Sequence, residues 1–153
     1  MSLKIELKRV GQFSPLRYPG GKAALSGLLD QVIKAQLLHG SVYVEPYAGG
    51  AGAALTLLFL EKVEQIVIND LDPAIYAFWK AATEESEWLV EKVMTVPLTI
   101  DEWKKQRSIY ADESMRGTKE LGFALFYLNR TNHSGIVSGY PIGGIEQTGK
   151  WKM

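Results

Sequence analysis

The sequence predicts an α/β fold, in which a short parallel sheet with flanking helices is followed by a mainly helical region. Two short apolar runs rich in β-branched residues, at 42–46 and 65–70, lie on either side of one helical segment. After residue 70, roughly 60 residues show helical spacing of apolar side chains and no strand pattern. The length of 153 residues and the hydrophobic share of 46% suit one compact domain rather than a disordered chain.

The first element is a predicted helix at residues 22–38. Its apolar side chains recur at helical spacing and would form one stripe, which consists of Leu25, Leu28, Leu29, Val32, Ile33 and Leu37. Pro19-Gly20-Gly21 precedes this segment and Gly40 follows it, as expected for the start and the end of a helix.

The next segment has the pattern of strand, tight glycine turn and helix. Val42–Pro46 is the strand, the small residues 48–54 form the turn, and residues 55–60 continue as a helix. A second strand follows at 65–70, and its continuous apolar character is typical of a strand covered on both faces. We therefore expect a parallel βαβ unit with Asp70 at the carboxyl end of the second strand.

Helical patterns dominate the rest of the chain. Apolar spacing predicts helices around 75–82, 88–93 and 121–128, and Thr99 with Glu102 forms a capping box before another helix. From residue 129 to residue 152 the chain is rich in Gly, Ser, Asn and Thr, which predicts a long loop. Loops of this length in compact domains are usually functional or incomplete.

The composition excludes several function classes. Lys+Arg 17 balances Asp+Glu 17, so a site for nucleic acid would have to be a local positive patch. The chain has no cysteine, and His39 and His133 lack the acidic neighbours of a metal site, so neither thiol chemistry nor a metal is expected. No segment has the pattern of a signal peptide or a membrane span, which predicts a cytoplasmic protein that does not bind membranes.

A candidate cofactor site combines the glycine turn with the acid that ends the second strand. Glycines in the segment 45–52 would let the backbone approach a ligand at the start of a helix. Asp70 can accept hydrogen bonds from two ribose hydroxyls, which favours an adenosine-bearing cofactor. The alternative is a turn that only packs the helix against the sheet, with Asp70 as an ordinary loop acid.

A second candidate segment, residues 17–22, precedes the first helix. It differs from a phosphate-binding loop because Leu16 replaces the first glycine and Ala23 replaces the Ser or Thr, so a nucleoside triphosphatase is disfavoured. The segment either presents an aromatic ring and an ammonium group beside the glycine turn or simply caps the helix.

The third candidate segment begins the long loop. Arg130 and Lys150 suit phosphate groups, Asn132 and Ser134 suit base edges, and His133 or Tyr140 could stack on an exposed base. The alternative is a solvated loop without a ligand.

Together these segments resemble the DNA adenine methyltransferase family, the Dam-like class that uses S-adenosylmethionine. Residues 15–22 are similar to its aromatic-x-Gly-Gly-Lys cofactor motif, residues 45–52 to its Glu-Pro-Phe-x-Gly-x-Gly motif, and residues 68–72 to its acidic ribose-binding loop. Residues 127–136 resemble the start of its DNA-recognition region. The resemblance covers nearly the whole chain, with the segments in the family's order.

The resemblance implies a fold, a reaction and a set of site residues. Residues 1–83 would be part of a Rossmann-like methyltransferase domain, and residues 84–153 a helical DNA-recognition insert that is truncated at its C-terminal end. The family transfers a methyl group from S-adenosyl-L-methionine to the exocyclic amino group of an adenine flipped out of double-stranded DNA. The implied cofactor site consists of Tyr18, Gly20, Gly21, Lys22, Glu45, Tyr47, Ala48, Gly49, Gly50, Gly52, Asp70 and Leu71. The implied DNA-binding residues are Arg17, Asn129, Arg130, Asn132, His133, Ser134, Tyr140 and Lys150, and Lys152 adds a further positive charge.

Two departures from the family pattern limit these expectations. The family's catalytic Asp/Asn-Pro-Pro-Tyr/Phe motif is absent, because the chain contains no Pro-Pro pair, and we therefore expect a fragment that is inactive alone. Dam proteins that recognise GATC more often have Gly, an aromatic residue and Asn at positions 132–134, and Arg at the position of Ser138, so the target sequence is open.

The sequence also allows two rival functions, and it predicts self-association. A dinucleotide-binding oxidoreductase shares the glycine turn and the terminal acid, but it would require more alternating strands and helices after Asp70. A non-catalytic nucleic-acid-binding fragment is the other rival. Two strands alone leave both sheet edges unpaired, which favours self-association, for example as a dimer.

Overall fold

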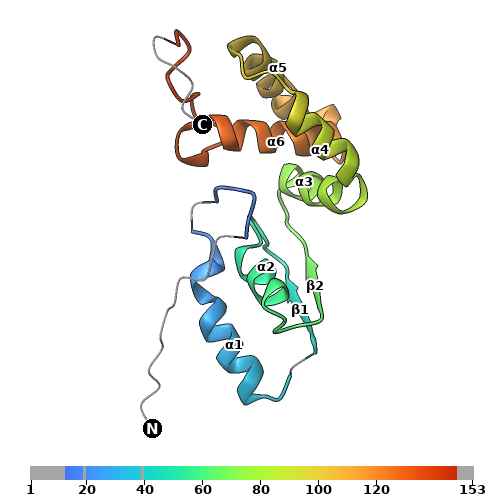
Figure 1. Cartoon of the computed structure of the whole chain (residues 1–153). Coiled ribbons are helices and arrows are strands. Elements are labelled where there is room, and N and C mark those ends of the chain that lie inside the picture. The colour runs from blue at the N-terminus through green and yellow to red at the C-terminus, as the bar shows by residue number, and fades with distance from the viewer. Residues whose placement is uncertain (1–12, 19, 39, 148–153) are drawn as a thin grey trace. The chain divides into compact units, whose positions relative to one another are not determined.

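The computed structural model describes residues 13–18, 20–38 and 40–147, and the chain divides into two compact units, Met1–Asp70 and Leu71–Met153 (Figure 1). The predicted division into functional regions at residues 1–83 and 84–153 stays a prediction.

The first unit contains the predicted βαβ arrangement. Strand β1 (Val42–Glu45) pairs in parallel with β2 (Gln65–Ile68), and helix α2 (Gly52–Phe59) connects the two strands. Val42 lies opposite Gln65 and Glu45 lies opposite Ile68, so both strands end at the same edge of the sheet. This parallel pair confirms the sequence prediction.

The predicted first helix forms, but only part of its apolar stripe is buried. A 3₁₀ turn (Lys22–Leu25) leads into α1 (Ser26–Ala35). Ile33 lies in a small core with Leu57 and Val63, whereas three other stripe residues, Leu25, Val32 and Leu37, are exposed. The physical reason is that a sheet of two short strands offers too little apolar surface to cover the whole stripe.

One face of the sheet is uncovered, which contradicts the expectation that the second strand is covered on both faces. Tyr43 and Ile66 lie opposite each other and pack against the core around Ile33, and the next residue along each strand points to the opposite face. On that opposite face, Val44 is 57% exposed and Val67 is 44% exposed. The continuous apolar pattern therefore marks a face that nothing covers among the described residues.

The second unit is helical, as predicted. Helix-capping side chains begin three of its helices: Asp72 accepts a hydrogen bond from the Ala74 backbone N–H at 2.8 Å, and Thr99 and Thr118 act in the same way. The described part of this unit contains no strand that belongs to a sheet. Its helices are α3 (Pro73–Glu84), α4 (Ser86–Thr95), α5 (Ile100–Ala111) and α6 (Lys119–Thr131), with short 3₁₀ turns at Glu113–Met115 and His133–Gly135.

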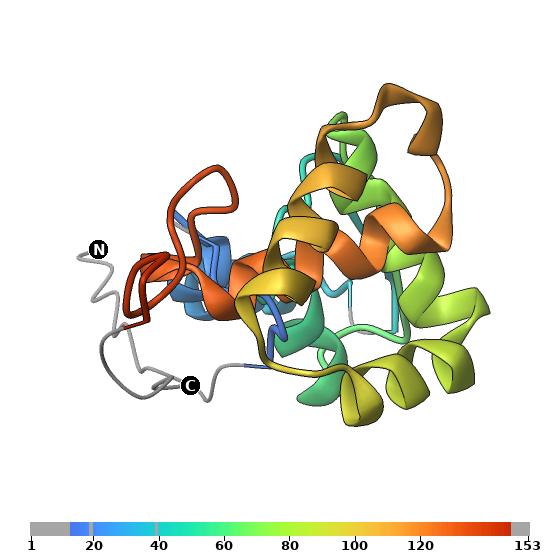
Figure 2. The ribbon, with the colours of Figure 1, turned by 90° about the horizontal axis from the view of Figure 1, so that it is seen from above.

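Helix α6 is the centre of this unit and packs against both α3 and α5 (Figure 2). The contact with α3 is close, because a Cβ atom added at Gly122 would lie 2.5 Å from the carbonyl oxygen of Ala77. Next to it, the rings of Phe78 and Phe126 stack with centroids 5.8 Å apart. The loop after α6 therefore begins at the end of a helix that packs closely against α3. None of the described helices is long and apolar enough to span a membrane.

Candidate functional site

The turn after β1 lies at the carboxyl edge of the sheet and is fixed by backbone hydrogen bonds. The Asn69 N–H donates to the carbonyl of Glu45 at 3.1 Å, and the Ala48 N–H donates to the carbonyl of Asn69 at 2.9 Å. These bonds extend the strand pairing past the ends of β1 and β2. They bring the glycine turn next to Asp70.

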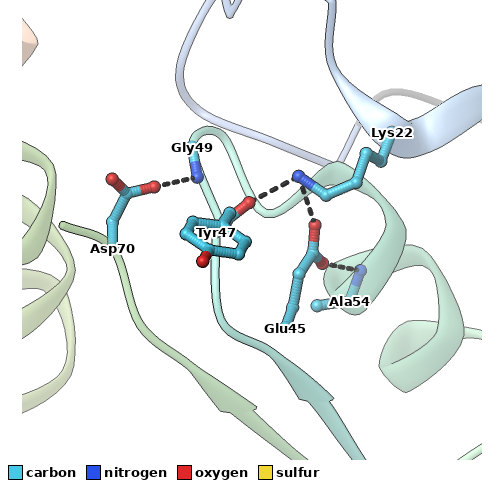
Figure 3. Close-up of polar contacts among 6 residues, drawn as sticks. All are labelled: Lys22, Glu45, Tyr47, Gly49, Ala54 and Asp70. Carbon is cyan, nitrogen blue, oxygen red and sulfur yellow. Dashed lines mark hydrogen bonds and ion pairs between the residues drawn. The ribbon is translucent and has the colours of Figure 1, made fainter. Parts of the chain in front are cut away.

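Asp70 contacts the glycine turn directly. Its Oδ2 accepts a hydrogen bond from the Gly49 N–H at 2.7 Å, and Figure 3 shows the carboxylate facing this N–H. Gly49 has φ of +50°, in the left-handed region where glycine avoids the steric cost of a side chain. The glycine turn and Asp70 are therefore in direct contact, and their role as a cofactor site stays a prediction.

Lys22 connects the segment before α1 to the other side of the turn. Its Nζ lies 3.0 Å from Oε1 of Glu45 and also donates a hydrogen bond to the Tyr47 carbonyl (Figure 3). Glu45 is only 2% exposed, and its Oε2 accepts a hydrogen bond from the Ala54 N–H of α2 at 3.1 Å. Because a buried carboxylate is costly unless it is paired, the ion pair compensates a charge that would otherwise destabilise the turn.

The ring of Tyr18 lies against the glycine turn. A Cβ atom at Gly49 would lie 2.8 Å from Cε1 of Tyr18, and one at Gly50 would lie 2.8 Å from the Ser14 hydroxyl. Larger residues at these two positions would therefore collide with the segment that precedes α1. Tyr18 is 46% exposed, so part of its ring faces solvent beside the turn.

The remaining predicted cofactor residues differ in their exposure and in the segment that carries them. Gly21 donates its N–H to the Tyr18 carbonyl at 3.2 Å and Gly20 is exposed. Tyr47 and Leu71 have exposed side chains, and Leu71 begins the second unit. Two further residues are buried: Ala48 in the turn and Gly52 at the first position of α2.

Sequence patterns did not identify the role of Ser14. Its hydroxyl bonds the backbone N–H and carbonyl of Leu16, at 3.2 and 3.1 Å, and so shapes the segment that carries Tyr18. A serine two residues before an apolar residue is too common a pattern to signal such a turn.

In the second unit, two of the predicted DNA-binding amides are buried. Asn132 has no exposed surface, and its Oδ1 accepts a hydrogen bond from Nε1 of Trp103 at 2.7 Å. Asn129 donates from Nδ2 to the carbonyl of Gly135 at 2.9 Å. These amides hold the loop, and a base contact by either one would require these bonds to break.

Other predicted DNA-binding residues lie at the surface of the loop. His133 and Ser134 are exposed, and Tyr140 is 65% exposed. The His133 N–H donates to the Tyr140 carbonyl at 3.2 Å, so the two ring-bearing residues occupy facing positions of the loop. Arg130 is half-buried near the end of α6. Three predicted positive charges lie elsewhere: Arg17 belongs to the first unit, and Lys150 and Lys152 lie outside the described residues.

The burial of Tyr127 on α6 perturbs its titration. Its hydroxyl donates to the Pro97 carbonyl at 3.1 Å, and desolvation by burial raises the pKa of Tyr127 to about 12. The Tyr127 hydroxyl thus connects α6 to the segment that follows α4.

A family comparison covers most of the chain. The sequence model of the D12 class N6 adenine-specific DNA methyltransferases matches residues 18–150. The match begins at Tyr18 and includes the glycine turn, Asp70 and the described part of the loop. A search of the curated proteins finds no match.

Proposed function

The chain belongs to the D12 class N6 adenine-specific DNA methyltransferases, and on this premise we propose that its first unit binds S-adenosylmethionine while its second unit contacts DNA. The family identifies DNA as the substrate and adenine as the modified base. The sequence-based family prediction is thus confirmed, and the rival oxidoreductase is not favoured.

The contact between Asp70 and the glycine turn carries the proposal for the cofactor. A carboxylate at the carboxyl edge of a parallel sheet can accept hydrogen bonds from the two hydroxyls of a ribose. The adjacent ring of Tyr18 offers a flat face to the adenine or to the methionine side of the same molecule. This chemistry fits a nucleoside that carries an amino acid.

Lys22 and Glu45 support the turn rather than the reaction. Their ion pair, 3.0 Å long, neutralises the buried carboxylate and fixes the Tyr47 carbonyl. When bound, S-adenosylmethionine supplies the activated methyl group, and the chain's own residues bind and orient it. Most of the predicted cofactor residues lie in the first unit, in or next to this turn.

Calorimetric titration of the chain with S-adenosylmethionine tests the cofactor proposal. We expect Asp70→Asn to weaken binding about tenfold or more, since hydrogen bonds to a charged group contribute roughly 1.5–3 kcal/mol. The exposed Glu64 provides the control, because Glu64→Gln removes an equal charge from the same unit. Tighter binding of NADH than of S-adenosylmethionine would contradict the proposal.

For DNA, the proposal uses positive charges and the exposed rings of the loop. In the second unit, Arg130 and the lysines at 150 and 152 would contact phosphates, and His133 or Tyr140 would stack on a base. Arg17 of the first unit would add a phosphate contact of its own. Duplex affinity, measured by fluorescence anisotropy, should fall as salt rises and fall further in Arg130→Gln. Arg116→Gln is the control, because Arg116 is an exposed arginine of the same unit that lies outside the loop. An affinity that does not depend on salt would contradict this part.

We also propose that the chain alone does not methylate DNA. The sequence has no Pro-Pro pair, so it lacks the family's Asp/Asn-Pro-Pro-Tyr/Phe motif, which would supply the acceptor for the target amino group. An assay with labelled cofactor and an adenine-containing duplex should give no turnover above a control without enzyme. Turnover would mean that other residues supply the acceptor. DNA binding without cofactor binding would instead favour a non-catalytic nucleic-acid-binding protein.

A further inference from the structure

Helix α5 holds the loop after α6 through two side chains on one of its faces. Trp103 donates from Nε1 to the Asn132 amide oxygen at 2.7 Å, and Arg107 donates from Nη1 to the Gly139 carbonyl at 2.8 Å. Residues four apart on a helix share a face, and the Arg107 guanidinium lies 5.1 Å from the centroid of the Trp103 ring. One helix therefore binds the loop near its start and near its end.

Asn132 connects these two attachments through the loop interior. Its Nδ2 donates to the carbonyls of Ile136 and Val137, both at 2.9 Å, while its Oδ1 accepts the Trp103 bond. Asn132 has no exposed surface and Trp103 is buried, so water cannot replace these partners. Loss of either side chain would leave a buried polar group of the other unpaired.

The backbone of this loop needs such support. Ser134 has φ of +55° and Gly135 has φ of +73°, so two successive residues lie in the left-handed region. This conformation is costly for Ser134 and persists only when surrounding bonds fix it. A loop of this shape would relax if its side-chain anchors were removed.

We propose that Asn132, Trp103 and Arg107 are positioning residues that hold loop 133–140 in the shape in which it meets DNA. This inference rests on the proposed DNA-binding function of the loop. Arg107 acts here through the Gly139 carbonyl and not through a phosphate. Because these bonds hold the loop backbone before binding, stacking of a base on the exposed rings of His133 and Tyr140 carries a smaller backbone ordering cost.

Arg107 could raise duplex affinity by contacting a phosphate or by positioning the loop, and these two roles predict different dependences of affinity on salt. A side chain that contacts one phosphate contributes about one unit to the slope of log affinity against log salt. A positioning residue contributes to affinity and leaves this slope unchanged. The slope therefore separates positioning from simple charge attraction.

The test compares Arg107→Met and Trp103→Phe with the unaltered chain. Arg107 is exposed, so its replacement should leave the fold intact, and Arg116→Met is the matched control. Amide hydrogen exchange at the His133 and Gly139 N–H groups should become at least tenfold faster in both variants and stay unchanged in the control. Duplex affinity should fall severalfold in both variants, with the salt slope of the unaltered chain.

Each other outcome has a defined meaning. Unchanged exchange in both variants would overturn the inference, whatever their DNA affinity. A slope that falls by about one unit in Arg107→Met would assign Arg107 to a phosphate and also overturn it. Absence of duplex binding by the unaltered chain would refute the proposed function and the DNA part of the inference, while exchange would still decide whether α5 holds the loop.

Discussion

Glu45 shows how the glycine turn depends on the charge of a single carboxylate. Its two carboxylate oxygens face two donors, the Lys22 ammonium and the Ala54 N–H. Glu45→Gln replaces one of these acceptors with an NH₂ group, which would then face either the Lys22 ammonium or the Ala54 N–H, a donor against a donor. We expect the free energy of unfolding to fall by roughly 2–4 kcal/mol.

Urea denaturation measures this loss. Glu64→Gln, in the same unit, should shift the midpoint by far less because its side chain is exposed. Equal midpoints for the Glu45 variant and the unaltered chain would show that the ion pair does not stabilise the turn.

Tyr127 gives a prediction about pH. Burial raises the pKa of Tyr127 to about 12 from the ordinary value of 10.0. Between these values the unfolded chain releases the phenol proton while the folded chain retains it, so the free energy of unfolding should decrease as pH rises from 10 to 12. Below pH 10 this contribution is fully present.

The comparison with Tyr127→Phe isolates this effect, because other groups titrate in the same range. The difference in unfolding free energy between the two proteins should be constant from pH 7 to about 9 and should shrink above pH 10. A constant difference up to pH 12 would mean that the Tyr127 phenol titrates normally.

At the scale of elements, local sequence signals predicted which helices and strands form. Thr99 accepts the Glu102 N–H as the capping box requires, and the βαβ order follows from β-branched runs around a glycine turn. Exposure was harder to predict, because it depends on what packs on each face. Val44 and Val67 look like core residues in sequence and are exposed in the structure.

The crossing of α3 and α6 gives a prediction for Gly122. In an ordinary helix Gly→Ala stabilises by about 1 kcal/mol. Here the added Cβ would lie 2.5 Å from the Ala77 carbonyl oxygen, and backbone must move to avoid it. Overpacking of this kind costs roughly 1–3 kcal/mol, so Gly122→Ala should lower the melting temperature.

Thermal unfolding followed by circular dichroism is the measurement. Ser108→Ala, at an exposed position of α5, serves as the control and should change the melting temperature little. A more stable Gly122→Ala variant would mean that α3 and α6 separate at little cost.

At the scale of the whole molecule, the uncovered sheet face predicts self-association. Exposed apolar side chains on a sheet with unpaired edges favour pairing with another chain. We expect light scattering to detect a dimer or larger species for the unaltered chain, and mainly monomer for the double variant Val44→Lys and Val67→Lys. Val90→Lys controls for added charge, because Val90 is exposed on α4. A monomeric unaltered chain would contradict this prediction.

The candidate sites were predictable to different degrees for a physical reason. Asp70 and Gly49 come together because parallel strands end at one edge, which is a rule of topology. Asn132 and Trp103 are 29 positions apart in the sequence, and their contact depends on how α5 packs against α6. Polar side chains in a loop suggested DNA contacts, but only the structure distinguishes those that face solvent from those that hold the loop.

Because the Asn132 amide is buried, the surface of the loop can change during evolution while the bonds that anchor it remain. The side chains of Asn132 and Trp103 are buried, whereas His133, Ile136, Ser138 and Tyr140 are exposed. Mutations at the exposed positions leave the anchoring bonds in place, so they alter the loop surface with little loss of stability. Under the proposed DNA-binding role of the loop, descendants of one ancestral gene could therefore diverge in their DNA contacts while inheriting the same scaffold.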